Sequence, residues 1–204
     1  MTKVGIMGGT FNPIHFGHLI LAETAYEEIG LDRILFIPSK NPPHKDSTEV
    51  ISEEHRLKMV ELAVQGNPHF QLSTIELDRE GTTYTVDTLA QLTKENPNTD
   101  YYFIMGADSL IKLETWKNCQ GVLDLCTVVV AGRDDLKTED IQLKIQYYKD
   151  KYGARIITLN MPSYELSSGF LRDRISKGKS IQYYVPEKVK DYILSNFLYM
   201  SNSN

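Results

Sequence analysis

The sequence predicts an α/β protein with a Rossmann-like, doubly wound and mainly parallel sheet, helices on both faces and a small helical C-terminal subregion. Two observations support this class. Short β-branched apolar segments alternate with stretches of helical periodicity, and the first such segment runs into a glycine-rich loop. Such alternation indicates βαβ units, whose right-handed crossovers bring the carboxyl ends of the strands to one edge. Sheets of this kind bind ligands at that edge.

The apolar, β-branched segments are the expected strands. They are Lys3–Met7, Arg33–Ile37, Phe70–Glu76, Tyr101–Met105, Thr127–Ala131 and Arg155–Leu159. The expected helices carry apolar residues on one face at intervals of three or four. They are His18–Ile29, Glu53–Val64, Thr85–Lys94 and Thr138–Tyr152, with a short helix through Ile111 and two more in Ser167–Tyr199 around Gly178 and Pro186.

No internal repeat, low-complexity tract or Gly/Ser linker divides the chain. We therefore expect one domain over residues 1–200, with 167–200 as its helical C-terminal subregion and 201–204 as a disordered tail. The longest irregular segment is Pro38–Ser52. A loop of that length in a compact domain is more often functional or mobile than a simple connection.

Charge and composition exclude several classes of protein. The 204 residues hold 22 Lys+Arg and 27 Asp+Glu, a net charge of −5 that argues against general nucleic-acid binding. No apolar run approaches the roughly 20 residues that span a bilayer, so no membrane partner is expected. The two cysteines, Cys119 and Cys126, have no metal-ligand or CxxC spacing. We expect two buried thiols in a reduced, cytoplasmic protein.

The loop GGTFNPIHFGH at residues 8–18 joins the first strand to the first helix. Gly8 and Gly9 lack a Cβ, so a phosphate or an adenine could approach the backbone there. The helix that follows offers unpaired N–H groups and a positive dipole end to an anion, with His15 and His18 beside it. The loop matches neither the P-loop nor the dinucleotide fingerprint GxGxxG. A zinc site on the two histidines, or a plain turn with two surface histidines, stays open.

This loop resembles the signature GxFxPxHxGH of the nucleotidyltransferases, and the whole chain resembles their bacterial nicotinate-mononucleotide adenylyltransferase family. The resemblance covers essentially all of residues 1–200. It includes PPHK at 42–45, YTVDTL at 84–89, FIMGAD at 103–108, Trp116 and SSGFLRDRI at 167–175. It implies a nucleotidyltransferase domain that transfers the adenylyl group of ATP to nicotinate mononucleotide, giving nicotinate adenine dinucleotide and pyrophosphate in NAD biosynthesis. It also implies in-line attack by phosphate oxygen, without a covalent intermediate.

The resemblance assigns site residues by position. The catalytic residues it implies are His15, His18 and Arg172. The ATP site it implies is Gly8, Gly9, Thr10, Phe11, His15, His18, Gly106, Asp108, Arg133, Ser167, Ser168 and Arg172. The mononucleotide site it implies is Asn12, His44, Lys45, Thr85, Asp108 and Trp116. Mg²⁺ is expected to arrive with ATP, and no metal ligand is assigned because Mg²⁺ keeps several waters.

Two positions depart from the family pattern. Gly169 replaces the Thr of SSTxxR, which removes a hydroxyl but keeps the backbone N–H. Asn12 stands where the family often has Asp, so it carries no charge for a cation.

Each assigned residue also has a structural alternative. The serines at 167 and 168, Thr85 and Asp108 could be ordinary helix N-caps. Arg133 and Arg172 could be solvated surface cations, and Lys45 a solvated loop lysine. Trp116 could be core packing.

Other functions compete with adenylyl transfer to nicotinate mononucleotide. A phosphopantetheine adenylyltransferase shares the first signature but lacks the YTVDTL and Trp116 constellation. A non-catalytic nucleotide sensor could keep the glycines without His18 or Arg172, and a redox dehydrogenase would need GxGxxG. A helix beginning near Thr85 favours a carboxylate ligand, hence nicotinate over nicotinamide. Aromatic residues expected at the surface, Tyr147, Tyr148, Tyr183 and Tyr184, permit a homo-oligomer.

Overall fold

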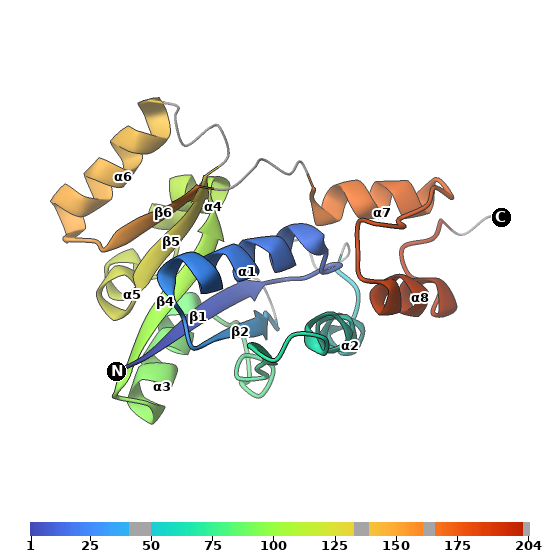
Figure 1. The fold of residues 1–204 in the computed structure, drawn as a ribbon, viewed down its shortest axis with the longest axis horizontal. Helices are drawn as coiled ribbons and strands as arrows, with labels where there is room; N and C mark the ends of the chain where they lie inside the picture. Colours follow the sequence, from blue (N-terminus) through green and yellow to red (C-terminus); the bar gives the residue numbers. More distant parts are fainter. Residues whose placement is uncertain (41–49, 133–138, 161–165, 202–204) are drawn as a thin grey trace.

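The computed structural model describes residues 1–40, 50–132, 139–160 and 166–201. Within these ranges the chain forms a six-stranded sheet in the order β3-β2-β1-β4-β5-β6, and every neighbouring pair of strands is parallel (Figure 1). The strands are β1 (Thr2–Gly9), β2 (Arg33–Pro38), β3 (Phe70–Leu72), β4 (Thr99–Gly106), β5 (Thr127–Gly132) and β6 (Ile156–Asn160). This order confirms the predicted doubly wound, Rossmann-like sheet, because the winding reverses between β1 and β4.

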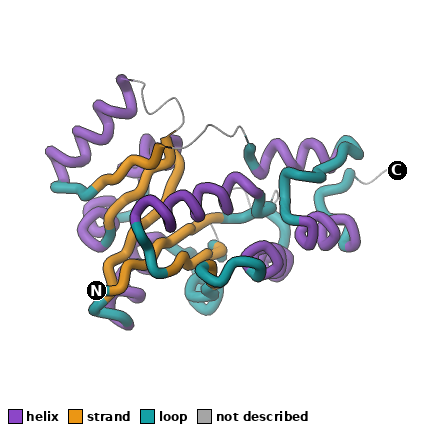
Figure 2. Tube along the Cα trace, viewed as in Figure 1, coloured by secondary structure: helices purple, strands orange, loops and turns teal. Residues whose placement is uncertain are grey.

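Helices cover both faces of the sheet (Figure 2). They are α1 (Phe16–Ile29), α2 (Glu53–Val64), α3 (Thr85–Glu95), α4 (Ala107–Lys112), α5 (Cys119–Leu125), α6 (Glu139–Tyr152), α7 (Ser168–Ser176) and α8 (Glu187–Ser195), with a 3-10 turn η2 (Leu113–Thr115). One apolar core joins the sheet to α3, α4, α5 and α6 and includes Leu89 and Leu110. The other joins it to α1, α2, α7 and α8 and includes Met59 and Leu171. Burial on both faces explains why the strands read as apolar runs.

The strand predicted to reach Glu76 is shorter than expected. β3 lies at the edge of the sheet and pairs only with β2, and this pairing ends at Leu72. Beyond it the chain turns back on itself, and the Asp78 N–H donates to the Thr74 carbonyl at 3.0 Å. Glu76 therefore lies in a turn rather than in the sheet.

The helix α5 is absent from the sequence prediction. It spans only seven residues, too few to show an apolar period, and it begins at an N-cap side chain. The Asn118 Oδ1 accepts the N–H of Gly121 at 3.1 Å. A single Asn is a weak signal of a helix start when no periodic stretch follows it.

The aromatic surface expected around residues 147–148 is wrong for Tyr148. This side chain is fully buried, and its hydroxyl donates to the Leu110 carbonyl at 3.0 Å. Tyr148 therefore anchors α6 to α4 inside the core and cannot serve an interface. Tyr183, by contrast, is 85% exposed. Both cysteine thiols are free and buried, as expected.

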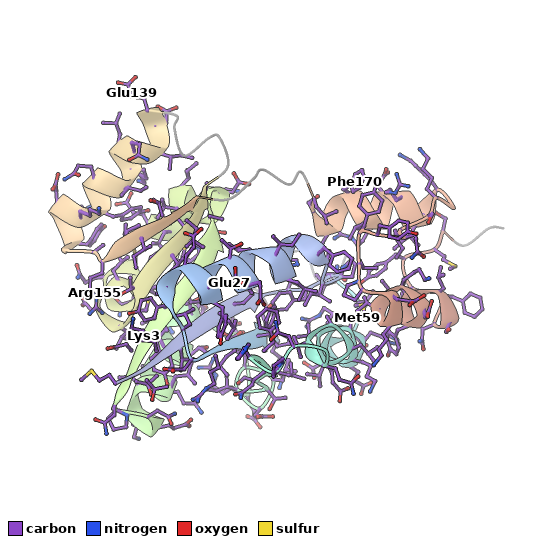
Figure 3. All side chains as sticks on the ribbon, viewed as in Figure 1. Lys3, Glu27, Met59, Glu139, Arg155 and Phe170 are labelled. Atoms are coloured by element: carbon purple, nitrogen blue, oxygen red, sulfur yellow. The ribbon has the colours of Figure 1, made fainter. Side chains whose placement is uncertain are left out.

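The C-terminal helices α7 and α8 lie at the same end of the sheet, where α8 packs against α2 (Figure 1). Leu171 on α7 and Val189 on α8 belong to the same buried cluster as Met59 of α2. Met59 and Phe170, which mark α2 and α7, are labelled in Figure 3. None of the described helices is long and apolar enough to cross a bilayer.

Gly5 in β1 gives a test of how tightly the sheet packs. A Cβ built there would lie 2.5 Å from Ile34 Cδ1 and 2.9 Å from Leu31 Cδ1, and both side chains are buried. We expect Gly5→Ala to lower the free energy of unfolding by about 1–3 kcal/mol through overpacking, measured by urea denaturation. Gly66→Ala is the matched control, because nothing lies within 4 Å of a Cβ there. Equal stability of the two variants would contradict this account of β1.

Candidate active site

A cavity of about 740 Å³ opens at the carboxyl edge of the sheet, where β1 and β4 end side by side. This is the position at which the strand order reverses, the usual ligand site of an open α/β sheet. Many of the residues predicted for the site line it. They are Gly8, Gly9, Thr10, His18, Thr85, Gly106, Asp108 and Trp116.

The two histidines of the first loop form a stacked pair. Their ring centroids are 3.8 Å apart with an interplanar angle of 28°. The backbone N–H of His15 donates to His18 Nδ1 at 3.3 Å. Because that nitrogen accepts a hydrogen bond, the neutral ring of His18 carries its proton on Nε2. His18 lines the cavity and so brings an N–H donor to a ligand there.

His15 is buried, 5% exposed, which rules out the reading of two surface histidines. Burial lowers the pKa of His15 to about 4, so the ring is neutral at physiological pH. Its Nδ1 is buried without a hydrogen-bond partner among the described residues. A Cβ on Gly17 would lie 3.0 Å from that nitrogen, so glycine lets the ring fold over the start of α1.

Gly8 and Gly9, at the end of β1, leave space for the aromatic rings of Phe103 and Phe11. A Cβ on Gly9 would lie 3.3 Å from the Phe11 ring, and one on Gly8 would lie 3.4 Å from Phe103. Phe11 is buried and packs edge-on against His18, with ring centroids 5.1 Å apart. The small residues therefore allow an aromatic support for His18 as well as exposing backbone to the cavity.

The start of α7 is attached to the first loop. The Ser168 hydroxyl donates to the Pro13 carbonyl at 2.8 Å, and Arg172 Nη1 donates to the Asn12 carbonyl at 3.0 Å. Ser167 is the N-cap, with its Oγ accepting the Phe170 N–H at 3.1 Å, so the capping alternative is confirmed for this serine. These bonds bring α7 up to the segment that carries His15.

Asn12 and Gly169 lie on this same side of the site. Asn12 is buried, and its Oδ1 accepts the Tyr199 hydroxyl at 2.9 Å. Its side chain therefore turns toward the C-terminal segment and does not line the cavity. A Cβ on Gly169 would meet only Ser167 Oγ, at 3.9 Å, so the position has space for the family's threonine.

The opposite wall is built by the first turn of α3. Its N-cap is Tyr84, so Thr85 is the first helical residue and the N-cap alternative for Thr85 is wrong. Unpaired first-turn N–H groups and the helix dipole favour an anion at this point. The Thr83 hydroxyl is buried in the same wall and has no hydrogen-bond partner among the described residues.

Trp116 faces this wall from the turn after η2. It is half-buried and packs edge-on against Phe103, with ring centroids 5.9 Å apart. The turn is anchored by Glu114, which accepts from Lys144 Nζ and from the Tyr147 hydroxyl, each at 2.6 Å. The hydrogen bond from Lys144 is the main reason that the pKa of Glu114 is lowered to about 2.

The helix α4 carries Asp108, an exposed residue, in its first turn. Gly106 holds the N-cap position, so the N-cap alternative for Asp108 is wrong. Lys112, one turn later on the same helix, also lines the cavity and was missed by the sequence analysis. The spacing of four residues from Asp108 could have indicated it.

Lys117 was missed as well, because its role depends on a contact with a segment distant in the sequence. Its Nζ lies 3.2 Å from Asp87 Oδ2 and 4.2 Å from the centre of the Tyr84 ring. Lys117 therefore connects the turn that carries Trp116 to the first turn of α3.

Three predicted residues, His44, Lys45 and Arg133, lie outside the described residues. In the described part of the chain, no group of three or more His, Cys, Asp or Glu side chains is placed to hold a metal ion. The paired histidines therefore offer no zinc site with a third protein ligand from these residues.

Comparison with known proteins finds close relatives. Residues 6–174 match the cytidylyltransferase-like family. The chain is 51% identical over 200 residues to a protein of Lachnoclostridium phytofermentans named probable nicotinate-nucleotide adenylyltransferase, covering 98% of this chain and all of that one. It is 42% identical to a protein of the same name from Thermoanaerobacter sp., covering 97% and 94%. The fold is similar to that of a Plasmodium falciparum nicotinic acid mononucleotide adenylyltransferase complexed with NaAD, with a TM-score of 0.81, 20% identity and 98% of both chains covered.

The burial of His15 predicts a pH-dependent stability. The unfolded chain protonates this ring near pH 6.5 and the folded chain only near pH 4, so between these values the unfolded state binds more protons. Stability should fall as the pH falls through this window, by up to about 3 kcal/mol. We expect His15→Gln to remove this part of the loss when urea unfolding is compared at pH 7.5 and 4.5. An unchanged pH dependence in the variant would refute the assignment.

Proposed function

The chain belongs to the cytidylyltransferase-like family and, within it, to the nicotinate-nucleotide adenylyltransferases, and from this premise we propose that it transfers the adenylyl group of ATP to nicotinate mononucleotide. The products are nicotinate adenine dinucleotide and pyrophosphate. The reaction places the protein in NAD biosynthesis.

One observation supports this assignment best: the cavity holds both an anion donor and a site for an aromatic acid. His18 lies at the β1 end, while the first turn of α3 and Trp116 lie together at the other side. A pyridine ring stacked on Trp116 would direct its carboxylate to the N–H groups near Thr85. The phosphate of the same mononucleotide would then extend toward His18.

The chemistry needs no protein nucleophile, because phosphate oxygen is itself a competent one. The protein must hold two anions that repel each other and stabilise the charge that spreads over the transferring α-phosphoryl group. We propose that His18, through Nε2–H, donates to that group, and that His15 supports it as the stacked neutral partner. Donation from a neutral ring avoids burying a charge before ATP binds.

The clamp for the outer phosphates is proposed to come from α7. Arg172 and Ser168 both hydrogen-bond to carbonyls of the loop that carries the histidines. The two elements that would hold the triphosphate are thereby fixed to each other. Mg²⁺ bound to ATP would neutralise further charge and requires few protein ligands.

The test of function is a pyrophosphate-release assay with ATP and four acceptors: nicotinate mononucleotide, nicotinamide mononucleotide, phosphopantetheine and no acceptor. We expect release with nicotinate mononucleotide and a lower kcat/KM with nicotinamide mononucleotide, because the N-terminus of α3 favours a carboxylate. Equal values for the two mononucleotides would refute the carboxylate site. Release of pyrophosphate only with phosphopantetheine would support a phosphopantetheine adenylyltransferase. Binding of ATP without any release would support a non-catalytic nucleotide sensor.

Removal of the proposed donor should slow transfer without unfolding the protein. We expect His18→Ala to lower kcat/KM by at least about 10²-fold, because the loss of one donor to developing charge has that effect. His55→Ala is the matched control. His55 hydrogen-bonds to the Tyr192 hydroxyl at 2.9 Å and does not line the cavity. A folded His18→Ala variant with near-normal turnover would eliminate this role.

A further inference from the structure

Three cations lie directly behind the cavity wall: Lys40, Arg56 and Arg79. None of them lines the cavity, yet each hydrogen-bonds to a residue that does or to the segment that carries one. We refer to these three side chains as the cation brace. Their contacts form a continuous path from α2 to the first turn of α3.

The brace begins at Arg56 on α2, which is 1% exposed. Its Nη1 donates to the Thr10 carbonyl at 2.9 Å and to the Ser39 carbonyl at 2.6 Å. Its Nη2 donates to the Lys40 carbonyl at 3.1 Å, and its Nε to the Ile51 carbonyl at 3.3 Å. One guanidinium therefore connects the segments that follow β1 and β2, and both Thr10 and Ser39 line the cavity.

Lys40 continues the path across the site. Its Nζ donates to the Leu77 carbonyl at 2.8 Å and to the Arg79 carbonyl at 2.9 Å. These carbonyls belong to the turn between β3 and α3. The turn that leads to Thr83 and Thr85 is thereby fixed to the end of β2.

Arg79, in the turn before α3, completes the path to that helix. Its Nη2 hydrogen-bonds to the Thr88 hydroxyl, which in turn donates to Glu76 Oε1 at 2.7 Å. Thr88 and Glu76 are both buried and both line the cavity. The first turn of α3 is thus held to its preceding turn by a polar network of Arg79 Nη2, the Thr88 hydroxyl and Glu76 Oε1.

We propose that Lys40, Arg56 and Arg79 are positioning residues that set the cavity wall without touching the substrate, and that Lys40 and Arg79 set the part of this wall that receives the mononucleotide. The proposal rests on the proposed function, since it concerns how the same site receives its acceptor. Arg56 fixes the β1 and β2 ends, whereas Lys40 and Arg79 fix the turn before α3. A substrate group displaced by 1 Å can lose up to about 10²-fold in rate, so small shifts of this turn should be measurable.

The charge of the brace gives it a second effect on the same ligand. Burial lowers the pKa of Arg56, but a guanidinium remains protonated in proteins. Glu76, which lines the cavity, lies 4.0 Å from Arg79 and offsets its charge, so the positive potential behind this wall comes from Lys40 and Arg56 in a chain whose net charge is −5. The brace therefore favours an anionic acceptor from behind while its carbonyl contacts hold the wall in place.

The test uses Lys40→Met and Arg79→Met, because Arg56 is buried so deeply that its loss could unfold the chain. We expect each variant to raise the KM for nicotinate mononucleotide by about tenfold and to leave the KM for ATP within about twofold. Quenching of Trp116 fluorescence by nicotinate mononucleotide, with α,β-methylene ATP present, gives the Kd without turnover and should rise in parallel. Lys58→Met is the matched control, since Lys58 is an exposed residue of α2 paired with Glu61 at 2.7 Å.

A double variant separates a shared network from two independent effects. If both cations act through the turn before α3, Lys40→Met with Arg79→Met should raise the KM for the mononucleotide by less than the product of the single effects. Multiplicative effects would overturn the brace as one unit. Unchanged KM and Kd in both single variants, or equal losses for both substrates together with a lower Tm, would overturn the positioning role.

The wild-type enzyme distinguishes this proposal from the proposed function. If the wild type releases no pyrophosphate with nicotinate mononucleotide, the function fails, and the brace as stated fails with it. If the wild type is active and the Lys40→Met and Arg79→Met variants both behave like the Lys58→Met control, the proposed function stands and the brace alone is refuted.

Discussion

The structure depends on how the loop between β1 and α1 is held. This loop carries His15 and His18, whose stacking and hydrogen bond need the chain at residues 10–16 to keep one shape. Its carbonyls accept hydrogen bonds from Arg56 on α2 and from Arg172 on α7. Distant parts of the chain therefore help to set the geometry of the histidine pair.

The positive potential of the site is concentrated at a few points rather than spread over the protein. The chain is acidic, and a cavity for two anionic substrates must concentrate positive potential at chosen points. His15 is neutral at physiological pH and so contributes a stacking surface rather than a charge. The lining holds Lys112 and Lys117 as well as the carboxylates of Glu76 and Asp108. The remaining positive potential comes from Lys40 and Arg56 behind the wall and from the N-terminal ends of helices.

The sequence was sufficient to predict the sheet, because a doubly wound sheet is encoded by strand–helix alternation that needs no long-range information. The motifs shared with the adenylyltransferase family, rather than the alternation, predicted that His18, Thr85 and Trp116 would lie in one site, and all three line the cavity. The prediction from sequence failed where a role depends on a contact between distant segments. Nothing near Lys40 or Arg56 in sequence indicates that their partners lie after β1 and before α3. The prediction missed short elements such as α5 for a different reason, since seven residues are too few to show an apolar periodicity.

The C-terminal helices show why such contacts decide function. Read along the sequence, residues 167–200 look like an appendage to the sheet. In the structure, α7 hydrogen-bonds to the first loop at Asn12 and Pro13, and Tyr199 reaches Asn12 through its hydroxyl. The Phe16 N–H at the start of α1 donates to the Tyr184 carbonyl at 3.0 Å. The C-terminal segments therefore hold the loop between β1 and α1 in place. A shift of α7 or of the segment around Tyr199 would move the histidine pair.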